Sequence, residues 1–107
     1  GTAVKRLRIR FSEAAITDII EQSDWYRQRS GNALSARWDR EIDSVIQRIL
    51  RNPETGAHCS FPSVELVGLR RTSVEGFPKH LIFYRIGDNE IFVLRVLHGA
   101  RDLEGLF

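Results

Sequence analysis

Several residue types are scarce in this sequence, and each shortage excludes a class of protein. The single cysteine, Cys59, rules out a disulfide within the chain, so a reducing cytoplasm is the simplest location. No stretch approaches the roughly 18 consecutive apolar residues that a membrane-spanning helix requires. Only two of the 16 basic residues are lysines, and the formal net charge is just +2. So small a positive excess argues against a protein that binds a large RNA through its phosphates.

The length and the overall composition are those of one globular domain. The chain has 107 residues, of which 42% are apolar and 28% charged, so we expect a single domain over residues 1–107 with a small core. The sequence starts Gly-Thr-Ala without a methionine, and we expect residues 1–3 to be a cloning remnant. No apolar stretch of a secretion signal is seen there.

The charges are unevenly distributed along the chain. Residues 5–10 hold four bases and no acid, and residues 66–102 hold six bases and four acids, whereas residues 12–52 hold six bases and seven acids. Positive charge therefore gathers on the segments that we expect to be strands. A basic sheet face would attract an acidic protein or a phosphate backbone, although arginines can equally well solvate the exposed side of a sheet.

The strand signal is strongest in the last third of the chain. Two apolar segments, 81–86 and 91–97, are rich in β-branched and aromatic residues and flank Gly-Asp-Asn at 87–89, which predicts a tight hairpin. The second segment is apolar on both faces, so we expect it inside the sheet. Residues 67–74 predict another strand, which a turn at 76–78 links to the hairpin. At 6–11, arginines alternate with apolar residues, which indicates an edge strand.

Two helices are expected between the first strand and the later ones. Ser12 is a suitable N-cap for a helix that ends near residue 29, with Ile16, Ile19, Ile20 and Tyr26, and Ser23 between them, on one face that we expect to be buried. Apolar residues then recur at three- and four-residue steps over 33–51, and Asn-Pro at 52–53 ends this second helix.

The two helices should pack as an antiparallel hairpin, followed by a loop at 53–65. The order β-αα-βββ predicts the α+β class, with a mostly antiparallel sheet and the helical hairpin packed on one face. The other face of the sheet, and a groove between hairpin and sheet, would then be available for binding.

Pieces of the chain resemble the ParE branch of the ParE/RelE toxin superfamily. They are Arg-Asn-Pro at 51–53, Leu-Arg-Arg at 69–71, HLIFYRI at 80–86 and VLRVLHGARD at 93–102. The resemblance covers residues 7–102, is most specific in the last hairpin, and implies the RelE/ParE-like fold already expected from the pattern.

The resemblance also implies a function. Family members are toxins of type II toxin–antitoxin modules, so the chain is expected to be a cytoplasmic toxin that inhibits DNA gyrase, arrests growth and serves plasmid maintenance. A ParD-like, DNA-binding antitoxin would neutralise it in a toxin–antitoxin hetero-oligomer, with no cofactor and no membrane partner. On this interpretation the chain is not an enzyme. The alternative is a RelE-like, ribosome-dependent mRNA endoribonuclease.

Candidate site residues lie on or just after the last three expected strands. For contact with the target or the antitoxin they are Arg70, Arg71, Lys79, Tyr84, Arg95, His98 and Arg101. RNA cleavage would need a base, cations that offset charge at the phosphorus, and a proton donor. The candidates for that chemistry are Arg70, Arg85, Arg95 and His98. The few lysines and the His-Gly-Ala-Arg-Asp ending favour the gyrase inhibitor.

The same side chains have structural interpretations. Arg70 and Arg95 could pair with acids at 65, 90 or 102, and His98 could be a hydrogen-bonded core histidine. Phe83 and Tyr84 point to opposite faces of a strand, so one should be core and the other exposed.

Other prominent residues are expected to be structural. Trp38 and Tyr26 are predicted core anchors. Adjacent His58 and Cys59 lack the spacing of a zinc site, and we expect no metal.

Overall fold

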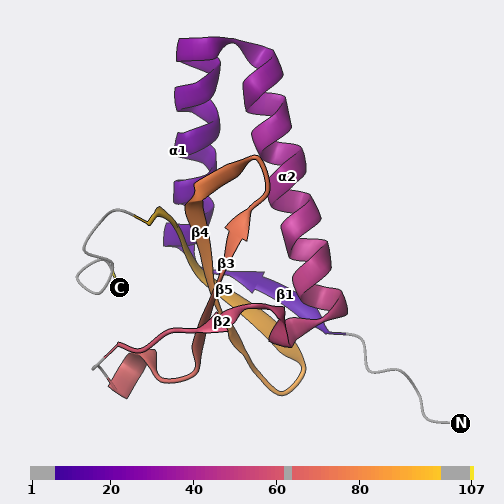
Figure 1. Cartoon of the computed structure of the whole chain (residues 1–107), viewed down its shortest axis with the longest axis vertical. Coiled ribbons are helices and arrows are strands. Elements are labelled where there is room, and N and C mark those ends of the chain that lie inside the picture. The colour runs from indigo at the N-terminus through magenta and orange to yellow at the C-terminus, as the bar shows by residue number, and fades with distance from the viewer. Residues whose placement is uncertain (1–6, 62–63, 100–106) are drawn as a thin grey trace, which may run out of the picture.

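The protein has two layers, a helical hairpin and a five-stranded sheet (Figure 1). This computed structural model describes residues 7–61, 64–99 and 107. Within them, the elements are β1 (Arg8–Phe11), α1 (Glu13–Ser30), α2 (Asn32–Arg51), β2 (Ala57–His58), β3 (Leu69–Val74), β4 (Phe77–Ile86) and β5 (Glu90–His98), with 3₁₀ turns η1 (Pro53–Thr55) and η2 (Val64–Leu66). The predicted α+β class and the order of strand, helical hairpin and strands are confirmed.

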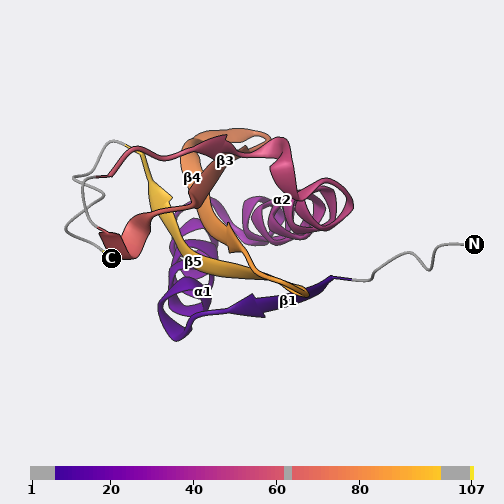
Figure 2. The same ribbon diagram turned by 90° about the horizontal axis from the view of Figure 1, so that it is seen from below.

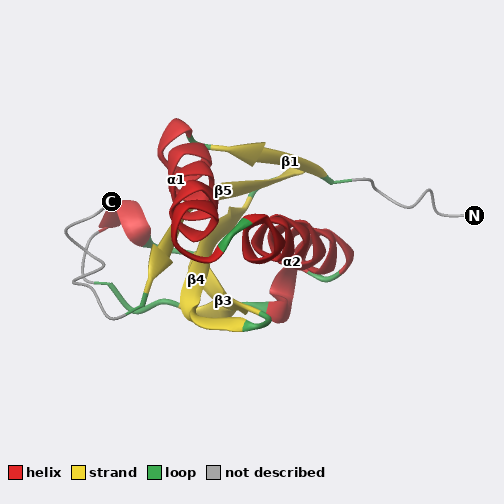
Figure 3. Ribbon diagram, turned by 90° about the horizontal axis from the view of Figure 1, so that it is seen from above, coloured by secondary structure: helices red, strands yellow, loops and turns green. Residues whose placement is uncertain are grey.

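The sheet has the strand order β1-β5-β4-β3-β2. β1 runs parallel to β5, and the other three neighbouring pairs are antiparallel. β5 therefore lies inside the sheet and β1 at its edge, as their apolar patterns predicted. Seen nearly along the helix axes, α1 lies over β5, and α2 lies on the side of β3 and β4 (Figures 2 and 3).

α1 begins as predicted and buries only part of the expected face. The Ser12 hydroxyl accepts a hydrogen bond from the Ala15 amide at 2.9 Å, which confirms the N-cap. Ile16 and Ile20 are 46% and 53% exposed, so the prediction that both lie on the buried face is wrong. Ser23 on the expected face is buried, Ile19 and Tyr26 pack against the core, and Ala15 is buried as well. The small side chains of Ala15 and Ser23 let the helix approach its neighbours closely.

α2 supplies most of the helical contribution to the core. Its apolar stripe is buried as the periodicity predicted, and Trp38 at its centre is fully buried. The Trp38 indole donates a hydrogen bond to the Ile19 carbonyl at 3.1 Å, and its ring lies edge-on to Phe77 with centroids 5.1 Å apart. Tyr26, half-buried, packs against both rings. The prediction that Trp38 and Tyr26 anchor the core is confirmed.

The far face of the sheet is partly covered, unlike the open face expected from the sequence. A second small cluster forms there around Leu66, Leu69, Phe83 and Leu97, with Phe107 packed on Phe83 at 5.2 Å between ring centroids. Tyr84 faces the helices in the main core. Phe83 and Tyr84 are both fully buried, so the expectation that one is exposed is wrong. Each face of the sheet is therefore packed against its own cluster of apolar side chains.

Three boundaries differ from the sequence prediction. The region 53–65 contains β2, which pairs with β3, where only a loop was expected. β3 begins at Leu69 because Gly68, with φ of +81°, turns the chain just before it. β4 begins at Phe77, not at 81, because Gly76 takes the same φ and closes a tight β3–β4 turn.

α1 closes the part of the β5 edge that β1 does not reach. β1 pairs only with residues 90–93 of β5. Beyond it, the Ser12 amide and hydroxyl donate to the carbonyls of Val93 (3.0 Å) and Leu94 (2.6 Å). Further along, the Asp18 carboxylate accepts from the Val96 amide at 2.9 Å. The backbone groups of a central strand are thereby satisfied by a helix.

β5 carries one extra residue relative to β4. Tyr84 is opposite Val93, but Phe83 is opposite Arg95, so Leu94 forms a β-bulge. The bulge reverses the alternation of side chains in the rest of the strand. Val96 consequently joins Val93 in the core under the helices, and His98 falls on that same face.

Three sequence predictions concern segments outside the described residues. These are the cloning remnant at 1–3, the candidate Arg101, and its neighbour Asp102. Neither α1 nor α2 is long and apolar enough to cross a membrane.

Candidate functional site

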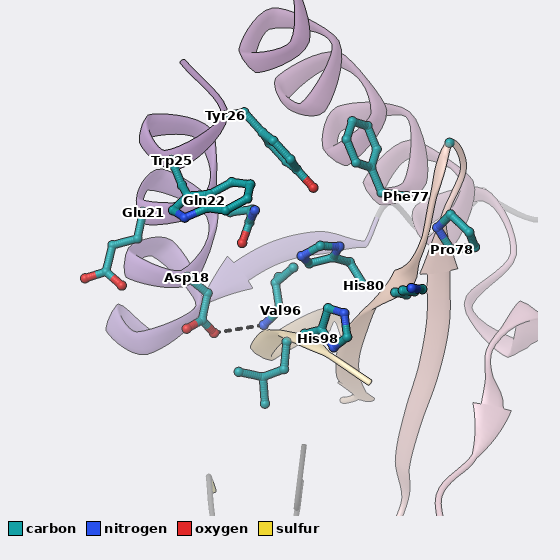
Figure 4. Close-up of a pocket in the computed structure, with 13 residues that line it drawn as sticks. Asp18, Glu21, Gln22, Trp25, Tyr26, Phe77, Pro78, His80, Val96 and His98 are labelled. Carbon is teal, nitrogen blue, oxygen red and sulfur yellow. Dashed lines mark hydrogen bonds between the residues drawn. The ribbon is translucent and has the colours of Figure 1, made fainter. Parts of the chain in front are cut away.

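A pocket of about 850 Å³ lies between α1 and the adjoining ends of β4 and β5 (Figure 4). It occupies the groove that we expected between the hairpin and the sheet. Its walls are Asp18, Glu21, Gln22, Trp25 and Tyr26 from α1, and Phe77, Pro78, Lys79, His80, Val96, Leu97 and His98 from the strands, with Gly76 at the turn. An aromatic-rich concavity with a few converging polar groups is the usual form of a binding site.

Two histidines face each other in this pocket. His80 on β4 is directly opposite His98 on β5, and their ring centroids are 5.4 Å apart. His80 also contacts Trp38 and Tyr26, at centroid distances of 5.0 and 6.5 Å. Burial, with a smaller contribution from the charge of His98, lowers the pKa of His80 below its usual value. At neutral pH His80 is therefore mainly the uncharged imidazole.

The α1 wall of the pocket is held by an ion pair. Arg95 donates from Nε and Nη2 to the two carboxylate oxygens of Asp18, both at 2.8 Å. The two side chains are only 21% and 12% exposed, and the hydrogen bond to Asp18 raises the pKa of Arg95. Asp18 was not among the partners expected for Arg95, and of those the acids at 65 and 102 have no described side chain. Glu90 instead pairs with Arg10 on the neighbouring strand.

The lip of the pocket is more exposed and carries charge. Trp25 is 48% exposed, and the Arg29 guanidinium lies over its ring at 4.7 Å. Glu21 on α1 and Lys79 on β4 are exposed on facing sides. The rim can therefore meet polar groups of a ligand while the aromatic walls contact its apolar part.

Two predicted site residues lie outside the pocket and hold a loop. The Tyr84 hydroxyl donates to the Pro53 carbonyl at 2.6 Å and accepts from the Gly56 amide at 2.8 Å. Arg70, opposite Tyr84 on β3, donates to the carbonyls of Gly56 (2.8 Å) and Glu54 (3.3 Å). Both side chains fix the 53–56 segment against the sheet.

The remaining candidates lie on the far face. Arg71 is opposite Phe83, and Arg85 is opposite Leu69, so both point away from the helices. The candidate ribonuclease set is thus divided: Arg70 and His98 are on the helix face, Arg85 is on the far face, and Arg95 reaches α1. Of the contact candidates that the structure describes, only Lys79 and His98 share the pocket.

Sequence reasoning missed much of this site. His80, Trp25, Gln22 and Asp18 were not singled out, because each looks like an ordinary helix or strand residue. Counting back from the 87–89 turn would place His80 opposite Leu97. Only the bulge at Leu94 brings His98 into that position.

The described residues hold no group of three or more His, Cys, Asp or Glu side chains placed to bind a metal. The adjacent His58 and Cys59 lie in and just after the two-residue β2. Burial raises the pKa of the Cys59 thiol, an effect that nearby Arg71 partly opposes. A largely protonated thiol is a poor metal ligand and a poor nucleophile.

Comparison with known proteins places the fold. The family model described as "ParE toxin of type II toxin-antitoxin system, parDE" matches residues 9–103. A structure of the chromosomal ParDE system from P. aeruginosa matches with a TM-score of 0.70 at 20% identity, over 89% of this chain and 98% of the other. No curated protein matches the sequence.

Two further solved structures match less closely. The YoeB/ParE toxin from Agrobacterium tumefaciens has a TM-score of 0.57 at 13% identity, over 86% of this chain and 98% of that one. The E. coli DinJ-YafQ toxin-antitoxin complex has a TM-score of 0.57 at 14% identity, over 89% and 94%. At these identities the likeness is one of fold.

Proposed function

The chain belongs to the ParE toxin family of type II toxin–antitoxin systems, and we propose that it inhibits DNA gyrase by binding, without breaking a bond itself. Growth arrest, a cytoplasmic site of action and a part in plasmid maintenance are included in this proposal. Its basis is family membership together with the way the chain uses its cationic side chains.

The main support for the proposal is that the candidate catalytic arginines are bound to other groups of the protein or lie apart from His98. RNA cleavage requires a base, cations and a proton donor within hydrogen-bond reach of one phosphate. Here Arg95 is bound to Asp18, Arg70 is bound to loop carbonyls, and Arg85 lies on the opposite face from His98. This arrangement supports a binding role over a catalytic one.

We infer a ParD-like antitoxin as the partner. Two of the matching structures contain toxin–antitoxin systems, ParDE and DinJ-YafQ. Trp25 at the pocket rim leaves apolar surface exposed, and so do Ile16 and Ile20 elsewhere on α1. Apolar surface of this kind is typically covered by an amphipathic segment of a partner.

The proposal is tested by inducing the chain in cells and following plasmid topology and DNA breaks. Gyrase inhibition predicts relaxed plasmids and linear DNA, and purified gyrase should lose supercoiling activity when the chain is added. Arrested translation with unchanged plasmid topology would reject it. Arg71→Ala and Lys79→Ala, both at exposed positions, should leave folding intact and show whether these candidates contact the target.

A second candidate is ribosome-dependent cleavage of mRNA. The observation in its favour is the His80–His98 pair with Lys79 at the rim of the same pocket, since two imidazoles and an ammonium group could serve proton transfer at a phosphate. Primer extension on mRNA after induction should then reveal cuts that His98→Ala removes. Arg95→Ala should also remove them, but a fold measurement must accompany it, because Arg95 holds α1.

A further inference from the structure

The closed end of the helical hairpin projects away from the rest of the molecule. Figure 1 shows it extending beyond the strands of the sheet. Gly31 alone links α1 to α2, with φ of +88°, and a Cβ there would meet nothing within 4 Å. The end of the hairpin is therefore a short, uncrowded turn between two helices. We call residues 25–37 the hairpin tip.

The hairpin tip is positively charged. Residues 25–37 hold three arginines, Arg27, Arg29 and Arg37, and no acidic residue. All three side chains are exposed. Among the described residues, the one ion pair that involves them joins Arg27 to Asp24, which lies just outside the tip. A projection of this kind attracts a surface of negative charge.

Trp25 adds a rigid apolar group to the tip. It is 48% exposed, and it is the only aromatic residue among the large apolar residues that are exposed in the described part of the chain. The Arg29 guanidinium lies over the indole at 4.7 Å, and the Tyr26 ring meets it edge-on with centroids 5.5 Å apart. An indole held in this way loses little freedom on binding. Tryptophan and arginine are also the residues that most often dominate the binding free energy of protein interfaces.

We propose that the hairpin tip is the surface through which the chain binds its target, and that it meets an acidic patch of a protein with a recess for the Trp25 indole. This inference rests on the proposed function, in which the target is gyrase. Trp25 also borders the pocket, so the antitoxin proposed there would cover part of the tip when it neutralises the chain.

The composition of the tip favours a protein over a nucleic acid. Three cations supply few phosphate contacts, and binding through them alone would be weak at physiological salt. The half-exposed indole contributes through burial of apolar surface, which salt does not screen. The arginines then add attraction and orientation toward an acidic surface.

The first test compares purified variants in a gyrase supercoiling assay. Trp25→Ala and Arg29→Gln should each require at least about tenfold more protein for half-inhibition than the unsubstituted chain. Ile20→Ala and Arg51→Gln are the matched controls and should inhibit as the unsubstituted chain does. Ile20 is 53% exposed on the same helix as Trp25, and Arg51, like Arg29, is an exposed arginine in the last turn of a helix. Thermal unfolding midpoints check that all four variants fold.

Growth arrest at equal protein levels in cells tests the tip without assuming the target. If the unsubstituted chain leaves gyrase active but arrests growth, the proposed function is wrong. Loss of arrest in the two tip variants alone would then still support the tip as the target-binding surface. Tip variants as active as the unsubstituted chain, or losses equal to those of the controls, would overturn the inference. No growth arrest by the unsubstituted chain would overturn both.

A labelled DNA duplex without gyrase tests the other class of partner. Fluorescence anisotropy at about 0.15 M salt should show no binding of the unsubstituted chain to the duplex. Binding that Arg29→Gln weakens and Arg51→Gln does not would place a phosphate backbone on the tip, and would overturn the assignment of a protein partner.

Discussion

Asp18 is a single side chain that completes both a sheet edge and an ion pair. One oxygen accepts from the Val96 amide and from Arg95 Nε, and the other accepts from Arg95 Nη2, all within 2.8–2.9 Å. The carboxylate side chain is 12% exposed. Its loss would remove two hydrogen bonds from a largely buried guanidinium and one from a strand amide.

Asp18→Ala should therefore lower the free energy of unfolding by about 3 kcal/mol, as measured by urea denaturation. Glu90→Ala is the matched control. It breaks the Arg10–Glu90 pair, whose side chains are 60% and 37% exposed, and should cost less than about 1 kcal/mol. If the two variants lost equal free energy of unfolding, burial of the Asp18–Arg95 pair would not be the reason for its larger contribution.

Tyr84 makes the stability sensitive to alkaline pH. Burial raises its pKa, although the hydrogen bond from Gly56 and the charges of Arg70 and Arg48 oppose the rise. In the unfolded chain tyrosine ionises near pH 10. The stabilisation is thus fully present below about pH 10 and is lost as the pH rises through the higher pKa of the native state.

We expect the free energy of unfolding to fall above pH 10 with a contribution of up to about 1.4 kcal/mol per pH unit from this group. Tyr26 and Cys59, whose pKa values burial also raises, add to the slope. Urea titrations at several pH values should show a shallower slope for Tyr84→Phe. An unchanged slope would mean that Tyr84 ionises equally in both states.

At the residue scale, the sequence predicted local interactions better than distant ones. The Ser12 cap depends on a residue three positions away, and it was found. The partner of Arg95 lies 77 positions away, and the acids proposed for it were those near it on the expected sheet. Nothing in local spacing identifies Asp18 over the other acids of α1.

At the scale of elements, the 53–56 segment makes its closest approach to β4 at one glycine. Gly56 has an ordinary extended backbone, with φ of −77°, so its need for glycine is steric. A methyl group there would overlap the Tyr84 hydroxyl and lie 2.8–2.9 Å from two ring carbons. The segment can approach the sheet this closely only without a side chain.

Gly56→Ala should destabilise the protein by roughly 1–3 kcal/mol, because the clash displaces the segment and its hydrogen bonds. In a double-mutant cycle with Tyr84→Phe the two losses should not add, since the hydroxyl forms part of the clash. Gly68→Ala is the control: its Cβ would meet nothing within 4 Å, but its φ of +81° is strained for alanine. Its loss should be additive with Tyr84→Phe.

The types of the elements were predictable from the sequence. Which side chains of β5 face the helices after Leu94 was not. Hydrophobic periodicity identified both helices and the closing hairpin. The same pattern carries no sign of the bulge, because Leu94 and Val96 are both apolar and suit either face. The position of His98 beside His80 depends on that single extra residue, and so the site could not be assembled from spacing alone.

At the scale of the whole molecule, the sheet ends in an exposed edge strand. β1 pairs with β5 on one side, and among the described strands it has no neighbour on the other. Arg8 and Arg10 are exposed on it. Charges on such a strand discourage pairing with a second chain.

Replacing Arg8 and Arg10 by threonine should promote association that increases with concentration, seen as a larger mass in light scattering after size exclusion. Threonine suits a strand and carries no charge, so the edge becomes a better template. The lysine double variant keeps the charges and should behave as the unsubstituted chain. Similar masses for all three would contradict a protective role of these arginines.

The overall architecture was more predictable than the site because it depends on many weak signals that agree. Apolar periods of 3.6 and 2, turn residues and the Asn-Pro stop all indicate a helical hairpin on a sheet. The pocket depends on a few contacts between segments far apart in the chain, such as α1 with β5. A single register shift changes those contacts without altering the fold class.

The attachment of α1 to the β5 edge also has a consequence for local opening. α1 cannot detach without releasing the backbone groups that Ser12 and Asp18 hold at Val93, Leu94 and Val96. We expect the first turns of the helix and the second half of β5 to behave as one cooperative unit in deuterium exchange. Val96 amide protection should then fall together with that of α1 in Asp18→Ala, while β3 amides retain theirs.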